Sequence, residues 1–212
     1  MPTTTEFTEQ YIALHPSIKD CLQKCVINYS KLSRMIAKEL HLEKKASMEA
    51  ILIACRRYAL KIQKENALED KILEILKKGR LEIKTKIVVA IVDKAIYMEN
   101  LFAIERKIRK TADVFYALEG TNVFTIIISE QYLEEIKKQF SRNILKISPK
   151  LAMIIIKSPK EMETTPGVIS YLYSLFADRG INIMETISCW TDTLFIIAEN
   201  DVQSVIGFLT FS

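Results

Sequence analysis

Glycine, proline and histidine are scarce in this chain, and the shortages of glycine and histidine each exclude a class of function. The 212 residues contain five glycines, five prolines, two histidines and one tryptophan. No phosphate-binding G-x-x-x-x-G-K-S/T loop and no dinucleotide-binding G-x-G-x-x-G turn can be found. His15 and His41 stand apart from each other and from any Ser-His-Asp or H-E-x-x-H pattern. The sequence therefore predicts no catalytic residues, no enzyme activity and no cofactor.

Long apolar runs and leader features are missing as well. No run approaches the roughly 18–20 apolar residues of a membrane helix. The stretch "MPTTTEFTEQ" has neither the basic nor the apolar region of a secretory signal, so we expect a cytoplasmic protein that does not engage a membrane. Cys21 and Cys25 could share a helix face that holds a metal or simply packs, but no second ligand pair completes a metal site. Buried thiols are expected instead, because free cysteine is among the most buried residue types.

The composition that remains is typical of a globular protein with an uneven charge distribution. Apolar residues make up 49% of the chain and charged residues 26%. The first 80 residues carry 15 Lys and Arg against 10 Asp and Glu, whereas the other 132 carry 15 against 16. The basic character therefore belongs to the first third of the chain.

The first third of the chain is predicted to be helical. A first helical pattern turns around Pro16, a second follows Ser30 as a plausible N-cap, and a third covers 47–63 with apolar residues at helical spacing. A fourth pattern, 68–78, leads into the rest of the chain.

The second and third of these helices, joined by "HLEKKA", could form a helix-turn-helix. Basic side chains opposite the apolar stripe could contact DNA phosphates, but the outward N-terminal end of the third helix offers acidic and apolar residues, which read bases poorly. A solvated helix face explains the same charges, and both interpretations stay open. The candidate phosphate contacts are Lys44, Lys45, Arg57, Lys61 and Lys64.

From "RLEIKTKIVVAIVDK" onward, runs rich in Ile and Val alternate with helical patterns, which indicates βα units packed on a sheet. The first set of predicted elements is strand 83–93, helix 97–110, strand 112–118, strand 121–128, helix 130–140 and strand 143–148. The second set is strand 151–157, helix 166–179, strand 181–189, strand 192–198 and helix 200–210.

These two sets form an internal repeat about 67 residues apart, and the second copy ends before a fourth strand. Its open edge needs a strand from the first copy or from another subunit, so we expect at least a homodimer. The predicted class is α+β: an N-terminal helical, helix-turn-helix-like region followed by two ferredoxin-like βαββαβ units. The predicted domains are 1–65 (helical), 66–82 (connecting helix), 83–148 and 149–212.

The stretch "TTPGVISYLYSLFADRGINI" holds two of the five glycines, one at each end of a predicted helix. Gly180 would close the helix with a positive φ, and Arg179 suits its negative end. Pro166 fits the first helical position, and Gly167 after it would leave backbone N–H groups bare. Such groups favour an anion such as a carboxylate or phosphate. A tight Pro-Gly turn is the alternative.

The segment 151–210 resembles the ACT domain, a small amino-acid-sensing module found in aspartokinases and phosphoglycerate dehydrogenase. The resemblance rests on T-P-G-V at 165–168, the spacing to G-I-N-I at 180–183, and the two strands that follow. The segment 83–148 looks like a degenerate ACT unit in which "VDKAIYMENLF" replaces the Pro-Gly turn. The combination with N-terminal helices is similar to uncharacterised archaeal-type ACT-domain proteins.

The resemblance implies a ligand held at a dimer interface by the loop after the first strand, the start of the first helix and the second strand. Serine-sensing members carry an asparagine and a histidine where this chain has Thr164 and Met162, so the ligand's identity stays open. An alternative role for Asn182 is to cap the corner between helix and strand. The implied ligand-binding residues are Glu163, Thr164, Thr165, Pro166, Gly167, Val168 and Asn182.

The function expected from all this is regulatory binding of an amino acid or similar zwitterion at the C-terminal unit, relayed to the helical region and from there to DNA or a partner protein. Resemblance to an aspartokinase stops at the regulatory part, because the glycine- and lysine-rich kinase motif is missing from the first 80 residues. Two alternatives remain: an amino-acid-responsive, DNA-binding transcriptional regulator, and a structural dimerisation module with a vestigial site.

Overall fold

The computed structural model describes residues 3–42, 47–63, 66–96 and 98–210, and it shows an α+β protein. The chain forms two compact units, Met1–Lys71 and Ile72–Ser212, which we name the helical unit and the sheet unit. Across the described ranges, no helix is both long and apolar enough to cross a membrane. In the same ranges, no cluster of three His, Cys, Asp or Glu side chains could hold a metal ion.

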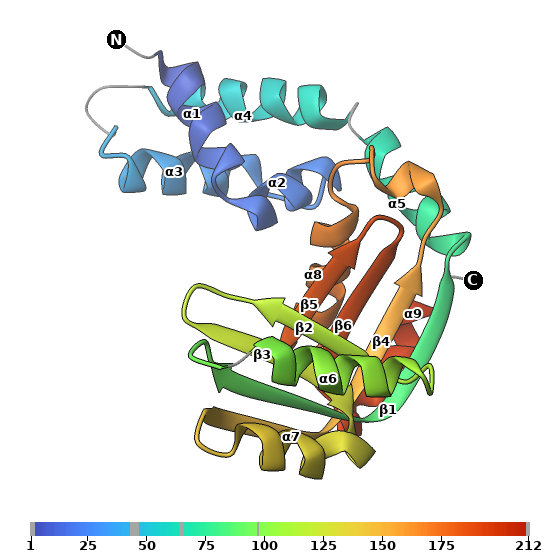
Figure 1. The fold of residues 1–212 in the computed structure, drawn as a ribbon. Helices are drawn as coiled ribbons and strands as arrows, with labels where there is room; N and C mark the ends of the chain where they lie inside the picture. Colours follow the sequence, from blue (N-terminus) through green and yellow to red (C-terminus); the bar gives the residue numbers. More distant parts are fainter. Residues whose placement is uncertain (1–2, 43–46, 64–65, 97, 211–212) are drawn as a thin grey trace. The chain divides into compact units, whose positions relative to one another are not determined.

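The helical unit groups its helices side by side (Figure 1), and their apolar stripes pack around one core. The first helix, which the sequence analysis missed, begins with a capping box: the Thr3 hydroxyl accepts from the backbone N–H of Glu6, and the Glu6 carboxylate accepts from that of Thr3. The spacing Thr-x-x-Glu was the signal that could have revealed it. The helices are α1 (Thr4–Ala13), α2 (Pro16–Gln23), α3 (Tyr29–Glu39) and α4 (Met48–Gln63), followed by α5 (Asn66–Lys77).

Two details of the helical region differ from the sequence-based expectations. Asn28, not Ser30, caps α3, because its side-chain oxygen accepts from the N–H of Lys31 at 3.0 Å. The thiols are not generally buried: Cys55 is, but Cys21 is half-buried, and Cys25 and Cys189 are exposed. Burial raises the pKa of Cys55 to about 11, which keeps this thiol protonated and unreactive at neutral pH.

The helical unit contains a buried phenol, that of Tyr11, and its stability should therefore decrease at alkaline pH. Tyr11 is 6% exposed and donates to the Glu39 carboxylate at 2.7 Å; burial, and then this hydrogen bond and the charge of Glu39, raise its pKa from 10.0 to about 12. Because the folded form holds this proton more tightly than the unfolded chain, the stabilisation is complete below pH 10 and is lost as pH rises toward 12. We expect the free energy of unfolding to fall by at most about 2.7 kcal/mol in this window.

Denaturant unfolding at a series of pH values measures this effect, with Tyr11→Phe as the control. The difference between the two proteins should shrink above pH 10, since the variant has no phenol to ionise. A constant difference up to pH 12 would contradict the assignment.

The sheet unit contains one six-stranded antiparallel sheet in the order β2-β3-β1-β4-β6-β5. The sheet is built from two βαββα repeats, and each repeat places two helices against it (Figure 1). The first repeat consists of β1 (Arg80–Asp93), α6 (Met98–Arg109), β2 (Phe115–Glu119), β3 (Val123–Ser129), the turn η1 (Glu130–Tyr132) and α7 (Leu133–Phe140). The second is β4 (Ile144–Lys157), η2 (Lys160–Met162), α8 (Val168–Ala177), β5 (Glu185–Cys189), β6 (Asp192–Ala198), η3 (Glu199–Asp201) and α9 (Val202–Leu209).

The two long strands β1 and β4 are each shared by both repeats. Residues 87–93 of β1 begin the first repeat, and 80–84 pair with β4 where the second repeat lacks a fourth strand. The predicted strands 143–148 and 151–157 are accordingly one strand, whose first part closes the first repeat and whose second part begins the second. The open edge expected beside the second repeat is therefore filled by the same chain. Each repeat thus has the 4-1-3-2 strand order of a ferredoxin-like unit.

Backbone conformation repeats along with topology. Lys86 and Lys150 have φ values of 54° and 58° at matching points of β1 and β4, beside the irregular register between the two strands. Ala112 after α6 and Gly180 after α8 are likewise both left-handed. In each case the next N–H reaches back to the helix, Asp113 to Ile108 O and Ile181 to Phe176 O.

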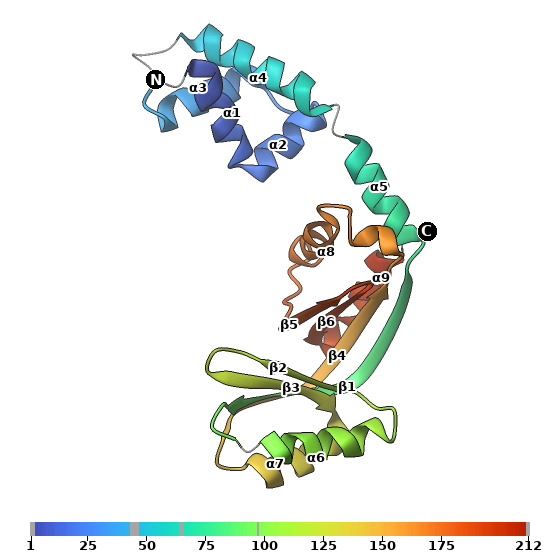
Figure 2. The same ribbon diagram turned by 45° about the horizontal axis from the view of Figure 1, so that its top comes forward.

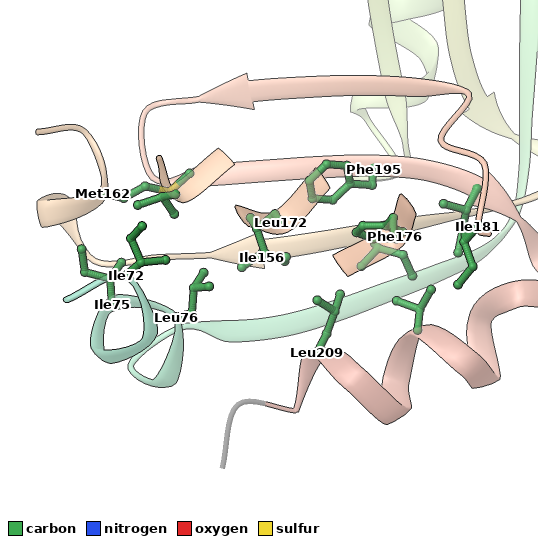
Figure 3. Close-up of a cluster of buried hydrophobic side chains, with 14 of the residues drawn as sticks. Ile72, Ile75, Leu76, Ile156, Met162, Leu172, Phe176, Ile181, Phe195 and Leu209 are labelled. Atoms are coloured by element: carbon green, nitrogen blue, oxygen red, sulfur yellow. The ribbon is translucent and has the colours of Figure 1, made fainter. Parts of the chain in front are cut away.

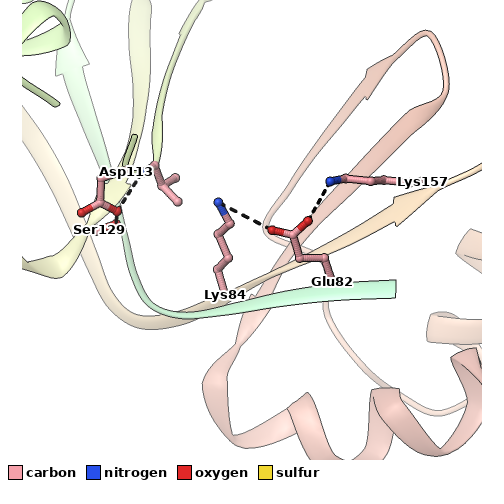
Figure 4. Close-up of polar contacts among 6 residues, drawn as sticks. Glu82, Lys84, Asp113, Ser129 and Lys157 are labelled. Carbon is pink, nitrogen blue, oxygen red and sulfur yellow. Dashed lines mark hydrogen bonds and ion pairs between the residues drawn. The ribbon is translucent and has the colours of Figure 1, made fainter. Parts of the chain in front are cut away.

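The sheet bends at these points, and each half carries its helices on the outer side (Figure 2). The helix-free side forms one apolar cluster with members from both halves of the sheet. Polar groups meet beside it: Glu82 pairs with Lys157 at 2.8 Å and Lys84 at 3.8 Å, while Asp113 accepts from Ser129 (Figure 4). The pairing with Lys157 lowers the pKa of Glu82. Because the sheet bends and both halves carry their helices on the outer side, the helix-free faces of the two halves turn toward each other.

Candidate functional site

The loop between β4 and α8, residues 158–167, carries most of the predicted ligand contacts and is named the site loop. Gly167 has a φ of 89°, the left-handed region, and serves as the N-cap of α8, which begins at Val168. Pro166 therefore lies before the helix and not at its first helical position. The alternative interpretation of Pro-Gly as a turn describes the backbone here.

Gly167 has a structural reason for lacking a side chain. A Cβ atom at this position would lie 3.3 Å from Cδ1 of Ile72, which belongs to α5. Ile72, Ile75 and Leu76 place this part of α5 in the core of the second repeat, beside Met162 (Figure 3). The missing side chain thus makes room for Ile72 and permits the positive φ, so glycine at this position is not itself evidence for a ligand.

The start of α8 nevertheless leaves backbone donors open. The first N–H of the helix that bonds to a protein acceptor within the described residues is that of Tyr171, which donates to Gly167 O at 2.8 Å. The three N–H groups before it lie at the positive end of the helix dipole, where an anion is favoured.

Two buried hydroxyl groups of the site loop have no hydrogen-bond partner among the described residues. Thr165 is 5% exposed and Ser158 8% exposed, and neither side-chain oxygen is paired. Sequence reasoning included Thr165 only through the family pattern and missed Ser158 altogether. Since a buried hydroxyl normally finds a partner, and leaving one without costs about 1–3 kcal/mol, these two groups require an explanation.

The other residues that were predicted to bind the ligand do not all lie in one place. Thr164 and Glu163 are exposed, and the Thr164 hydroxyl donates to Glu161 O at 3.4 Å. Asn182 is exposed and lies beyond the far end of α8, so a ten-residue helix of about 15 Å separates it from Gly167. In Figure 3, Met162 of the site loop and Ile181, the neighbour of Asn182, lie at opposite ends of the cluster. One copy of the chain therefore groups the site loop with the start of α8 but does not bring Asn182 to it.

The hairpin between β5 and β6 touches the site loop, a feature that sequence reasoning missed. The N–H of Ser158 donates to Thr191 O at 2.8 Å, and the buried hydroxyl of Thr193 contacts the Met162 sulfur at 3.9 Å. Lys160 extends its ammonium over the ring of Trp190, 5.5 Å from the centroid. The site loop thus contacts the hairpin tip (Trp190–Thr191) at two points and strand β6 at a third, through Thr193.

The DNA-contact hypothesis gains no support from the helical unit. Eight residues separate α3 from α4, whereas a helix-turn-helix uses a turn of about 3–4. Lys61 pairs with Glu9 of α1 at 3.3 Å, and Arg57 is exposed on α4. The candidates Lys44, Lys45 and Lys64 lie outside the described residues.

Comparison with known proteins finds similarity in structure only. No protein-family model matches the sequence, and no curated protein matches it. Among solved structures, the aspartate kinase of Clostridium acetobutylicum is 17% identical with a TM-score of 0.48, covering 62% of this chain and 33% of the kinase. The regulatory subunit of aspartate kinase from Thermus thermophilus is 11% identical with a TM-score of 0.47, covering 61% of this chain and 92% of the subunit.

A regulatory domain of aspartate kinase from Porphyromonas gingivalis, described as putative by its authors, is 10% identical with a TM-score of 0.47 and covers 62% of this chain and 94% of that domain. At such low identity the similarity concerns the fold, and it carries no information about a ligand.

Proposed function

We propose that this chain is a regulatory protein that binds an amino acid or a similar small zwitterion at the site loop of the second repeat. The observation that carries the proposal is the pair of buried, unpaired hydroxyl groups of Ser158 and Thr165 at the two ends of this loop. A hydroxyl both donates and accepts, so each of these groups can bond either the carboxylate or the ammonium of a small molecule. The open N–H groups at the start of α8 add donors for the carboxylate.

We also propose that ligand binding at the site loop is transmitted to the helical unit. Ile72 meets the turn at Gly167, and α5, to which it belongs, is the stretch of chain that leads back to the helical unit. A ligand that moved this turn would therefore act on the first residue of the sheet unit. Such a ligand shifts the protein only through its different affinities for the two arrangements.

A homodimer remains in the proposal, on a changed argument. The edge of the second repeat is already paired with residues 80–84. The strands left at the edges of the sheet are β2 and β5, and these are the candidates for pairing with a second copy. Asn182 of one copy could then complete the site of another, as the family pattern implies.

The test separates binding from stability with one substitution. In Thr165→Val the unpaired hydroxyl is replaced by a methyl group of similar size, so the ligand-free variant should be as stable as the wild type or up to about 1–3 kcal/mol more stable. The same variant should lose most of its affinity for the ligand. Ser158→Ala should behave in the same way.

A thermal-shift screen of the twenty amino acids measures both quantities. An amino acid present at about 100 times its Kd should stabilise the wild type by about 2.7 kcal/mol. Thr193→Val is the matched control, because Thr193 is also buried but its hydroxyl contacts Met162. No shift from any amino acid would remove the sensor proposal, and an undiminished shift in Thr165→Val would place the site elsewhere.

A further inference from the structure

Trp190 occupies a position where its residue type is unexpected. The hairpin between β5 and β6 turns through only two residues, Trp190 and Thr191, and Trp190 has a φ of 52°. Two-residue hairpins favour Gly, Asn or Asp at left-handed positions, and a bulky residue there is an outlier. The only tryptophan of the chain stands in this conformation with 62% of its surface exposed. Strain of this kind persists only where the surrounding structure imposes it, and it is enriched at functional sites.

Lys160 gives the exposed ring a specific neighbour. Its ammonium lies over the Trp190 ring, 5.5 Å from the centroid. Within the site loop Lys160 is the single cation, in contrast to the acidic Glu161 and Glu163. Lys160 lies two residues beyond Ser158, and the N–H of Ser158 holds the hairpin tip through Thr191 O at 2.8 Å. The loop that contains the two unpaired hydroxyls thus also contains a cation held over the Trp190 ring.

From this arrangement we infer that Lys160 binds the carboxylate of the ligand and that Trp190 positions Lys160 when the site is empty. A cation–π contact at an exposed ring is weak enough to be exchanged for a charge-assisted hydrogen bond to a carboxylate. On binding, the ammonium leaves the ring and the environment of Trp190 changes. The inference rests on the proposed function and deepens it, because it names the group on the ligand that is recognised and the residue that recognises it.

Tryptophan fluorescence tests the inference directly, since all tryptophan emission of the full chain comes from residue 190. Each of the twenty amino acids is titrated against the wild type, and those that alter the emission are titrated again as their C-terminal amides. The free acid should change the emission saturably. The amide, which lacks the negative charge, should bind at least about tenfold more weakly, as expected for loss of a hydrogen bond to a charged group.

Substitutions at Lys160 and at Lys157 distinguish a specific effect of Lys160 on affinity from an effect of the total charge. Lys160→Met should lower the affinity at least about tenfold and Lys160→Arg should retain it, whereas Lys157→Met removes the same charge three residues away and should change it less than about twofold. Trp190→Asn, which suits a left-handed turn, should remain folded and bind at least as tightly as the wild type in the thermal-shift assay, because it lacks the contact that is given up on binding.

The outcomes distinguish the inference from the function on which it rests. If no amino acid changes either the emission or the thermal stability of the wild type, the proposed function fails and the inference fails with it. If an amino acid binds in a manner that requires Thr165, but Lys160→Met binds it equally well or the amide binds as tightly as the acid, the proposed function stands and the role of Lys160 is overturned.

Discussion

Phe195→Ala is expected to lower the free energy of unfolding of the sheet unit by about 3–5 kcal/mol, the typical cost of truncating a buried phenylalanine. Phe195 is fully buried on β6 and lies opposite Ile154 of the neighbouring strand β4. Its ring packs against that of Phe176 of α8, 4.9 Å between centroids (Figure 3). It also meets the ring of Tyr173 edge-on, 5.7 Å between centroids. The substitution leaves a cavity where helix and sheet meet, and neighbouring strands hinder its collapse.

Urea unfolding followed by circular dichroism measures this loss, and Phe102→Ala provides the matched control. Phe102 lies on α6 with 48% of its surface exposed, so the same truncation should change stability by about 0.5 kcal/mol or less. Equal effects of the two substitutions would mean that Phe195 does not occupy the core of the second repeat.

Gly167→Val is expected to destabilise the sheet unit by about 3 kcal/mol, which combines a left-handed backbone cost with overpacking. The φ of 89° disfavours any β-branched residue, and the new side chain would meet Cδ1 of Ile72. Gly180→Val separates the two contributions. Gly180 also has a positive φ, 67°, but no atom lies within 4 Å of its hypothetical Cβ, so only the backbone cost of about 1–2 kcal/mol should appear.

A double-mutant cycle with Ile72→Ala measures the steric part. If the side chains at 167 and 72 collide, the damage from the two substitutions should be less than the sum of their separate effects. Strict additivity would show that Ile72 does not contact the turn, and the proposed relay through α5 would lose its basis.

The candidate site shows where sequence reasoning stops. The sequence placed Pro166 at the first helical position and offered a tight Pro-Gly turn only as the alternative, because the local preferences of proline and glycine are compatible with both. The contact of Gly167 with Ile72 could not be located in that way, since 95 positions separate the two residues. The contact between Trp190 and Lys160 likewise required the fold, since 30 positions separate the two residues.

The sequence by itself determined most of the helices and strands and their order in two similar sets, because the spacing of apolar residues reports which face of each element is buried. It did not reveal α1 or the continuity of β4. Only the tertiary structure decided that residues 80–84 lie beside β4. It also decided that the Ser158 and Thr165 hydroxyls are buried without a partner. Strand pairing and burial depend on groups that are distant along the chain, and no local preference specifies which of them meet.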